Sequence, residues 1–342
     1  MNQTRKRVKG ARANQTDIAR AAGVSTATVS RALNGTGVVT EDARARIDAA
    51  ITELGYMPHG AARALASRRS YTVGAVIPTL ASAIFAAGVD AFERRLNENG
   101  LTLLLALSNY DLETELQKVR TLLERGVDAI MLVGGEHAPG VHEAIARAGV
   151  PYIHTWAWEE DGGHPQVGFD NYTSMRKLAE HIGKAGHSDV AMIAGIAKDN
   201  DRAAQRISGA RAGFAAAGVT LRPDRIVEAA YTHEAARAAF RALWSTSSPQ
   251  LSAIVCGNDV LATGALVEAQ SQGIKVPKEL SITGFDDLPL AAHLNPPLTT
   301  ISVPAGEMGS RAADALALSL EVGEPPESTL LDADLVVRGT TR

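Results

Sequence analysis

Residues 16–35 read TDIARAAGVSTATVSRALNG, the pattern of two short helices separated by a glycine. Thr16 can cap a first helix that begins at Asp17, whose carboxylate suits the positive end of the helix dipole. Gly23 is placed to end this helix, and Ser25 can cap a second one. Because the connection between the two is so short, we expect the helices to cross sharply, as in a helix-turn-helix.

The second of these helices has an apolar inner face made by Val29, Ala32 and Leu33. The outward positions hold hydroxyls, a methyl group and an arginine, namely Thr26, Ala27, Ser30 and Arg31. Such side chains suit base edges and phosphates in a DNA major groove. An ordinary helical hairpin has a similar pattern, so this stretch alone leaves both interpretations open.

The distribution of charge favours DNA binding. Residues 1–69 carry 12 Lys and Arg against 5 Asp and Glu, a net charge of +7, whereas the other 273 residues carry a net charge of −11. Residues 1–13 have the composition of a flexible basic arm. An acidic protein with one strongly basic end is typical of a protein that binds a polyanion there.

A third helix is predicted after Thr40, with apolar residues at helical spacing up to Leu54 and a glycine at position 55. Residues 14–58 would then form a small helical headpiece. Pro58 breaks the third helix. Residues 59–70 are long enough for one more short helix, which would need a partner to be stable in water. We therefore expect this segment to be a hinge or linker.

These stretches, together with five later ones, resemble the lactose-repressor (LacI/GalR) family of bacterial transcription regulators. The first stretch continues in ITELGYMPHGAARAL, residues 51–65. The later matches are TVGAVIP (72–78), VGFDN (167–171), GNDVLATGAL (257–266), SITGFDDLPLA (281–291) and NPPLTTI (295–301). The resemblance covers nearly the whole chain, and VGFDN suggests a gluconate-regulator-like branch.

The resemblance assigns roles to residues of the headpiece and the hinge. It implies that Thr26, Ala27 and Arg31 read bases and that Leu65 of a hinge helix wedges into the minor groove of operator DNA. It also implies a positioning role for four polar residues, which are Ser25, Thr28, Ser30 and Asn34. The pair at 26 and 27 varies within the family, so it does not reveal the operator.

The chain from residue 71 onward predicts an α/β fold, because apolar strand-like runs alternate with helical patterns. The predicted helices cover 84–99, 111–125, 139–148, 203–217, 233–244, 259–272 and 305–321. The resembling fold is a periplasmic-binding-protein-like pair of lobes, each a parallel sheet with helices on both faces. It implies a first lobe of about 71–168 and 303–326 and a second of about 169–300 and 328–342, and this part would bind effector and dimerise.

Composition predicts a cytoplasmic protein with no membrane partner and no cofactor. The chain has one cysteine, Cys256, and shows neither a signal peptide nor a long apolar run. No heptad pattern follows Thr340, which favours a homodimer over a tetramer. His181 and His187 are six residues apart and do not share a helical face, so we expect no metal site from them.

The cleft between the lobes is the expected site of a small-molecule effector, because ligands of open α/β sheets bind beyond the carboxyl ends of the strands. The residues expected there are Phe85, Trp156, Trp158, Phe169, Asp170, Arg206, Asn258 and Asp259. The resemblance supports Phe85, Arg206 and Asp259 as effector contacts, while Asp170 has the placement of a helix cap. Aromatic faces beside a carboxylate and a guanidinium suit a sugar or sugar acid.

Other functions fit the sequence less well. No nucleophile elbow, P-loop or zinc-protease motif occurs, and we expect the adjacent carboxylates of Asp286 and Asp287 to point apart. This argues against a hydrolase. The sequence therefore predicts a ligand-responsive repressor of a carbohydrate or sugar-acid operon. A corepressor-dependent regulator of the purine-repressor type and a sugar-binding protein without DNA function remain the alternatives.

Overall fold

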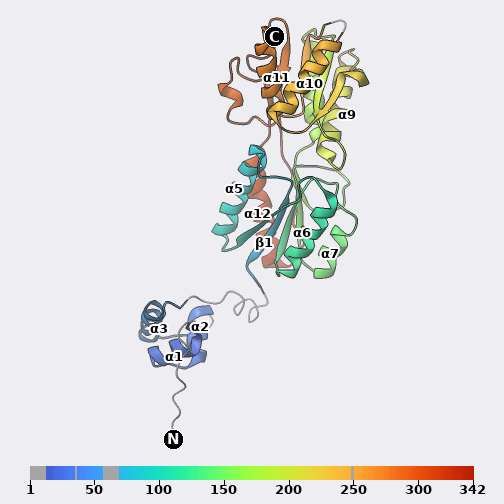
Figure 1. Cartoon of the computed structure of the whole chain (residues 1–342). Helices are drawn as coiled ribbons and strands as arrows, with labels where there is room; N and C mark the ends of the chain where they lie inside the picture. Colours follow the sequence, from blue (N-terminus) through green and yellow to red (C-terminus); the bar gives the residue numbers. More distant parts are fainter. Residues whose placement is uncertain (1–12, 35–36, 57–68, 248–249) are drawn as a thin grey trace. The chain divides into compact units, whose positions relative to one another are not determined.

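The computed structural model describes residues 13–34, 37–56, 69–247 and 250–342. The chain divides into two units, residues 1–70 and residues 71–342 (Figure 1). The first unit is a small helical headpiece, and the second is an α/β unit of two lobes. Residues 57–68, which include Leu65 and most of the expected hinge, lie outside the described residues.

The headpiece contains helices α1 (Gln15–Ala22), α2 (Thr26–Asn34) and α3 (Glu41–Leu54). Helix α1 begins two residues earlier than the sequence predicted, because Asn14 and not Thr16 is its cap. The Asn14 side chain accepts hydrogen bonds from the backbone of Thr16 and Asp17, and the Asp17 carboxylate accepts one from the backbone N–H of Asn14. This reciprocal capping box satisfies N–H groups that have no partner within the helix.

The headpiece core is small and rich in alanine. Ile18, Val29 and Ile47, one from each helix, are fully buried and pack in one cluster. Arg46 of α3 donates a hydrogen bond of 2.9 Å to the carbonyl oxygen of Ala22, at the end of α1. Gly23 continues from there in the left-handed conformation, with φ of 66°. Small side chains let the helices approach closely. The hydrogen bond from Arg46 holds the turn between α1 and α2 and so sets the orientation of α2.

Lobe 1 is built on a sheet whose strand order is β11-β5-β4-β3-β1-β2. Alternate residues of β1 and β3 face opposite sides of the sheet, as the period of a strand requires. Ala75 and Met131 pack under α5 and α12, whereas Val76 and Ile130 pack under α6 and α7. Figure 1 shows these two pairs of helices on opposite faces of the sheet. The elements are β1 (Thr72–Ile77), α5 (Ala83–Glu98), β2 (Thr102–Leu107), α6 (Leu112–Glu124), β3 (Ala129–Val133), α7 (Val141–Ala148), β4 (Tyr152–Thr155), β5 (Gln166–Gly168), α12 (Ala305–Val322) and β11 (Thr329–Leu330).

Lobe 2 repeats this plan with a parallel sheet of order β7-β6-β8-β9. Met192 of β6 faces the side covered by α8 and α9, and its neighbour Ile193 faces α10 and α11. The elements are α8 (Asn171–Lys184), β6 (Val190–Gly195), α9 (Asp201–Ala216), β7 (Ile226–Ala229), α10 (His233–Thr246), β8 (Ala253–Cys256), α11 (Asp259–Ser271) and β9 (Ser281–Thr283), with short 3-10 turns at Pro223–Arg225 and Ala291–His293. Both sheets are covered on both faces, which confirms the predicted fold class.

The chain passes between the lobes three times, after β5, between β10 (Thr300–Ser302) and α12, and between β11 and β12 (Asp334–Val336). Strands β10 and β12 form an antiparallel pair. The structure extends lobe 1 further than the sequence predicted: Thr329 and Leu330 pair with Val167 and Gly168 of its sheet. Lobe 1 therefore continues to residue 330 instead of ending near 326.

Glycines allow α5 and α12 to pack closely at the edge of the cleft. A Cβ added to Gly309 would lie 2.1 Å from the carbonyl oxygen of Gly88, and one added to Gly88 would lie 2.4 Å from the ring of Trp156. Any side chain at either position would push these elements apart. Among the described residues, no helix has the length and apolar character that a membrane crossing requires.

The capping box makes a testable prediction about headpiece stability. Asn14→Ala should lower the free energy of unfolding of the headpiece by about 1 kcal/mol, because the first turn of α1 loses its hydrogen-bond acceptor. Thr16→Ala, at the exposed position that the sequence suggested as the cap, is the matched control. Hydrogen exchange of peptides covering α1, followed by mass spectrometry on the full chain, measures both. Equal losses of protection in the two variants would contradict the assignment.

Candidate functional site

The headpiece presents one face of α2 to solvent. Thr26, Ala27 and Arg31 are exposed, and Ser30 is half-buried. Ser25 caps the helix, since its hydroxyl accepts a hydrogen bond of 3.1 Å from the N–H of Thr28, and the two hydroxyls lie 2.9 Å apart. Asn34 is the last residue of α2. The helix therefore offers its first turns and one cation outward, which suits a groove-reading helix.

The α/β unit holds a second candidate site, where strand ends of the two lobes face each other. Lobe 1 contributes Ser82, Ile84, Phe85, Tyr110 and Trp156 to a pocket there. The remaining lining residues come from lobe 2 and the turn after β9, and they are Asn200, Arg202, Arg206, Tyr231, Asn258 and Asp286. Phe85 and Trp156 meet edge to face with ring centroids 5.3 Å apart, and the ring centroids of Tyr110 and Tyr231 are 6.0 Å apart. The site thus combines aromatic faces with hydrogen-bonding groups.

Arg206 of α9 is the central polar group of this pocket. Its Nε donates to the side-chain oxygen of Asn171 at 2.9 Å, and one terminal nitrogen donates to the carbonyl oxygen of Gly257 at 2.7 Å. The same nitrogen lies 3.8 Å from a carboxylate oxygen of Asp286. The guanidinium carbon lies 3.8 Å from the centroid of the Phe285 ring. These contacts hold a buried guanidinium in one orientation.

Two groups of contacts cross from lobe 1 to lobe 2 beside the pocket. The side-chain nitrogen of Asn171 donates to the carbonyl oxygen of Trp156 at 2.9 Å. Gly135 N–H donates to the carboxylate of Asp201 at 2.7 Å, and Arg202 donates to the carbonyl oxygen of Val133 at 3.3 Å. The lobes are therefore bonded together around the pocket, whose free volume is only about 30 Å³. That is room for a single water molecule, so a larger ligand requires the lobes to separate.

Two carboxyl groups near the pocket have raised pKa values. Burial raises the pKa of Asp286 to about 8, against the opposing charge of Arg206. Burial also raises the pKa of Asp259 to about 6, although hydrogen bonds from Thr300 and Leu288 oppose this. Asp286 has φ of 120° and Asp287 has φ of 56°, conformations that cost free energy for residues other than glycine. Strained backbone beside a perturbed carboxyl group is typical of a functional site.

The structure brings four of the eight predicted effector residues to this pocket, Phe85, Trp156, Arg206 and Asn258. Phe169 is fully buried in the core, 6.1 Å from Phe285. Asp259 is also buried beneath the pocket, where its carboxylate accepts from Thr300 and from the backbone of Leu288. Neither lines the pocket.

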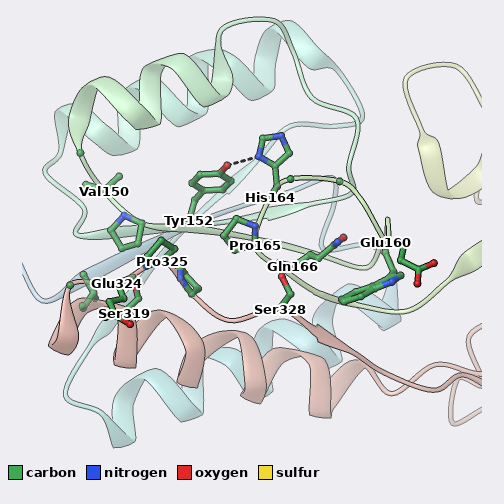
Figure 2. Close-up of a pocket in the computed structure, with 18 residues that line it drawn as sticks. Val150, Tyr152, Glu160, His164, Pro165, Gln166, Ser319, Glu324, Pro325 and Ser328 are labelled. Carbon is green, nitrogen blue, oxygen red and sulfur yellow. Dashed lines mark hydrogen bonds between the residues drawn. The ribbon is translucent and has the colours of Figure 1, made fainter.

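Asp170 and Trp158 lie elsewhere. Asp170 caps α8 through a hydrogen bond of 2.9 Å from Thr173. Trp158 lines two other cavities of the α/β unit. One of them, of about 860 Å³, is shown in Figure 2 and lies in lobe 1 between the β4–β5 connection and the end of α12. The two tryptophans of the expected cleft loop are therefore separated, because Trp156 has φ of 62° and turns toward the cleft before the chain continues.

Sequence reasoning missed Asp286, Arg202, Tyr110 and Tyr231 as pocket residues. The motif SITGFDD ends a strand, so its position signalled a ligand contact, but we considered the two aspartates only as a catalytic pair and set them aside. Their carboxylates do point apart, since Asp286 faces Arg206 and Asp287 pairs with Arg338 at 2.7 Å. Tyr110 and Tyr231 follow the ends of β2 and β7, so the same rule of placement after a strand could have found them.

Comparison with known proteins identifies the family of both units. A family model described as bacterial regulatory proteins, lacI family, matches residues 16–59, and one for a periplasmic binding protein-like domain matches residues 179–341. A ribose operon repressor of Haemophilus influenzae is 31% identical over 89% of this chain and 91% of its own length. The chain belongs to the lacI family. The HTH-type transcriptional regulator GntR of Pseudomonas aeruginosa is 32% identical over 95% of this chain and 94% of its own.

A solved structure supports the membership over both units. A lac repressor dimer bound to operator and the anti-inducer ONPF has a TM-score of 0.84 and 25% sequence identity. The match covers 96% of this chain and 99% of the lac repressor chain. The resemblance that the sequence predicted is thus confirmed. As a lacI-family member the chain is a DNA-binding transcriptional regulator, and the exposed face of α2 lies within the region matched by the lacI-family model.

The pKa of Asp286 makes a prediction about stability. Between its usual value near 3.8 and about 8, the folded protein holds a proton that the unfolded chain has lost. The carboxyl group therefore lowers the free energy of unfolding progressively as pH rises through this window, by at most about 1.4 kcal/mol per pH unit. Asp286→Asn cannot ionise, so its melting temperature relative to that of the natural protein should rise from pH 5 to pH 9.

Asp287→Asn is the control, because it removes a charge from the same turn without lining the pocket. Scanning calorimetry at half-unit intervals of pH gives the difference in melting temperature between each variant and the natural protein. A difference between Asp286→Asn and the natural protein that stays constant from pH 5 to pH 9 would contradict the raised pKa.

Proposed function

We propose that this protein is a cytoplasmic, homodimeric repressor of a carbohydrate or sugar-acid utilisation operon, released by a small-molecule inducer that binds between the lobes. The observation that carries the proposal is the pocket around Arg206, which joins aromatic faces to paired hydrogen-bonding groups at the boundary of two lobes. A name among the relatives, ribose operon repressor, supports an effector of the sugar class, and the GntR relative is compatible with a gluconate-regulator-like branch.

The proposed DNA contacts are those of α2. Thr26, Ala27 and Arg31 are exposed on one face of a helix whose other face is fixed in the headpiece core by Val29. We assign base reading to these three residues and positioning to Ser25, Thr28, Ser30 and Asn34. Leu65 stays a prediction from the sequence, as a minor-groove wedge, because it lies outside the described residues.

The proposed effector chemistry follows from the groups that face one another in the pocket. Asp286 can accept hydrogen bonds, Arg206 and Arg202 can donate them, and Asn258 can do both. Phe85 and Trp156 offer flat apolar surfaces, and the Nε1 atom of Trp156 is buried without a hydrogen-bond partner among the described residues. A polyhydroxylated ring or chain supplies hydroxyls for each of these groups.

The proposed coupling uses the contacts that cross between the lobes. An effector that enters the pocket must replace or rearrange contacts such as Asp201 with Gly135 and Asn171 with Trp156. Rotation of one lobe against the other changes the spacing of two headpieces in a dimer, which alters DNA affinity by a coupling of typically 1–3 kcal/mol. The lac repressor dimer on operator supports a dimer as the unit that binds DNA.

Selection from random DNA tests the proposed function directly. The full-length protein is used to enrich duplexes from a randomised library, and the enriched site is then titrated with and without sugars and sugar acids. We expect a palindromic site and at least one such compound that weakens binding. Enrichment of no shared sequence would overturn the DNA assignment, and a compound that strengthens binding instead would establish a corepressor.

Arg31 makes a prediction about this DNA complex. Arg31→Ala should weaken binding to the selected site and, if Arg31 contacts a phosphate as well as a base, lower the slope of log K against log salt by about one unit, because one cation no longer displaces a counterion. Arg94→Ala, which removes an exposed arginine of α5, is the control and should change neither quantity. Fluorescence anisotropy at several salt concentrations measures both. An unchanged affinity and slope for Arg31→Ala would refute its role.

Arg206 makes a prediction about the effector. Arg206→Lys keeps the charge but loses the planar fork, so it should weaken binding of the effector roughly tenfold or more while binding to the selected DNA is kept. Arg237→Lys, on α10 and paired with Glu268, is the matched control. Calorimetric titration with the compound found above gives both affinities. Normal effector binding by Arg206→Lys would show that the pocket is not the effector site.

A further inference from the structure

Four histidines from different parts of lobe 1 form one cluster that the proposed function does not use. His137 lies in the loop after β3, His142 in the first turn of α7, His154 in β4 and His164 just before β5. The rings of His142 and His164 stack with centroids 4.2 Å apart, and His137 lies 4.5 Å from His154. The chain has nine histidines in all, so nearly half of them gather in this one place.

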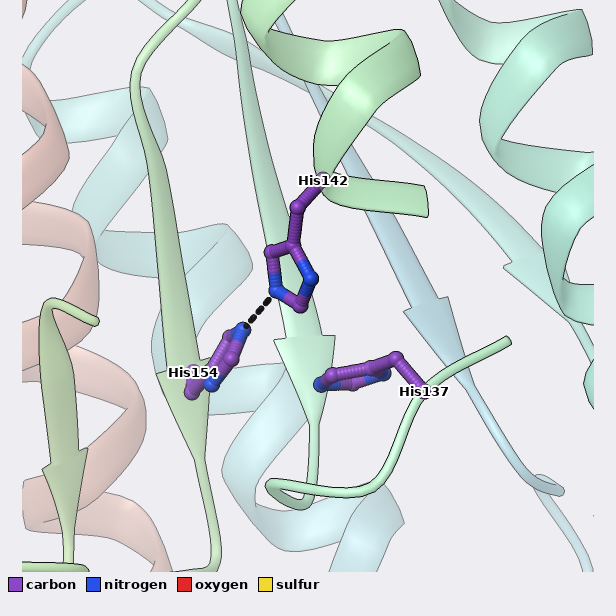
Figure 3. A group of neighbouring side chains, drawn as sticks. All are labelled: His137, His142 and His154. Atoms are coloured by element: carbon purple, nitrogen blue, oxygen red, sulfur yellow. Dashed lines mark hydrogen bonds between the residues drawn. The ribbon is translucent and has the colours of Figure 1, made fainter. Parts of the chain in front are cut away.

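Three of these side chains converge in the manner of metal ligands. Each of His137, His142 and His154 offers a ring nitrogen, and the three nitrogens lie within 4.8 Å of one another (Figure 3). The Nε2 atoms of His142 and His154 are 3.0 Å apart. Two nitrogens bound to one tetrahedral zinc ion are separated by roughly 3.3 Å, since each Zn–N bond is about 2.0–2.1 Å. This pair is therefore already close to the spacing that a metal ion needs.

His137 has the second partner that a metal-binding histidine commonly has. Its Nδ1 lies 2.9 Å from a carboxylate oxygen of Glu115, and its side chain is almost fully buried. Its Nε2 lies 3.1 Å from the carbonyl oxygen of Gly134. Both neighbours are hydrogen-bond acceptors, so a neutral ring can satisfy only one of them. With Nδ1–H held by Glu115, the lone pair of Nε2 is left facing a carbonyl oxygen and is available to a cation.

We propose that His137, His142 and His154 form a site for a divalent transition metal ion of the zinc type, with Glu115 as the residue that positions His137. Three imidazoles with a fourth position open to water or an anion suit Zn²⁺ and also accept Ni²⁺ or Cu²⁺, whereas Mg²⁺ and Ca²⁺ require oxygen ligands. The site is separate from the pocket around Arg206, and none of the three histidines lines that pocket.

The cluster lies beside a cavity of lobe 1, and the ring of His164 separates the two. Tyr152 and His164 line the cavity of about 860 Å³ in lobe 1, and the Tyr152 hydroxyl lies 2.5 Å from Nδ1 of His164 (Figure 2). His164 in turn stacks on His142. The ring of His164 therefore lies between this cavity and His142.

Metal binding also acts on the loop that joins this site to the cleft. Recruiting Nε2 of His137 removes it from the carbonyl oxygen of Gly134, and the next residue, Gly135, donates to Asp201 of lobe 2. A bound ion thus fixes the segment 134–142 between the histidine cluster and α9. Exchange of the amides in this segment reports on occupancy of the site independently of any DNA or effector.

The experiment uses full-length protein without a histidine tag, freed of metal by a chelator that is then removed. Titration calorimetry with ZnCl₂ should show one tight site per chain. Co²⁺ should give visible absorption bands of a four- or five-coordinate ion. Hydrogen exchange of the peptide covering 134–142 should slow when Zn²⁺ is added. MgCl₂ should produce none of these changes.

Two variants and a control locate the site. His142→Ala, at a half-buried position, should lose the tight site and the Co²⁺ bands. Glu115→Gln should keep one site per chain but bind roughly 10–100-fold more weakly, as expected of a residue that positions a ligand. His233→Ala removes an exposed histidine on α10 and should match the natural protein. Circular dichroism verifies that each variant is folded.

Three results would overturn the proposal. These are the absence of a stoichiometric site in the natural protein, an unchanged zinc affinity in folded His142→Ala, or an equal loss of affinity in His233→Ala. None of these results bears on DNA or effector binding, so the proposed function is tested independently of the metal site.

Discussion

The buried guanidinium of Arg206 is the constraint around which the cleft is organised. A charge removed from water is tolerated only where hydrogen bonds and other polar contacts replace its hydration. Arg206 donates hydrogen bonds to Asn171 and to the Gly257 carbonyl oxygen, and it lies 3.8 Å from Asp286, whose pKa of about 8 leaves that carboxyl group mostly protonated near neutral pH. Each of these partners stands at the end of a different strand or at the start of a helix, so the positions of three separate elements are fixed by one side chain.

The same constraint connects the lobes. Asn171 accepts from Arg206 in lobe 2 and donates to the carbonyl oxygen of Trp156 in lobe 1. The hydrogen-bonded sequence from Trp156 through Asn171 to Arg206 therefore crosses the boundary that a ligand must open. Displacing Arg206 from its partners changes the contacts of both lobes at once, which is the requirement for a site whose occupancy alters their relative orientation.

Local patterns predicted most of the elements but missed helix α8 (Asn171–Lys184), whereas long-range contacts decided the site. Helix ends followed from short-range signals such as Gly23 and Gly55, although Asn14 displaced Thr16 as a cap because a reciprocal bond with Asp17 satisfies more N–H groups. Placement after a strand suggested Phe85 and Trp156, and both line the pocket. It could not distinguish Asp259, which is turned under the pocket by Thr300, from Asp286, which faces it, because that choice depends on residues about 40 positions away.

The histidine cluster shows why spacing in sequence is a poor guide to sites on parallel sheets. His137, His142 and His154 have no helical or strand periodicity in common, so the sequence predicted no metal site. Strands β3 and β4 are neighbours in the sheet, with Val133 opposite Thr155, and this register brings the residues that follow β3 beside His154. The loop that carries His137 also carries the N–H that Asp201 accepts. A loop transmits a change at one contact to another only if both contacts hold it in place. On the side of lobe 1, Glu115 holds this loop, because its carboxylate accepts a hydrogen bond from the N–H of Ala138 and contacts the ring of His137.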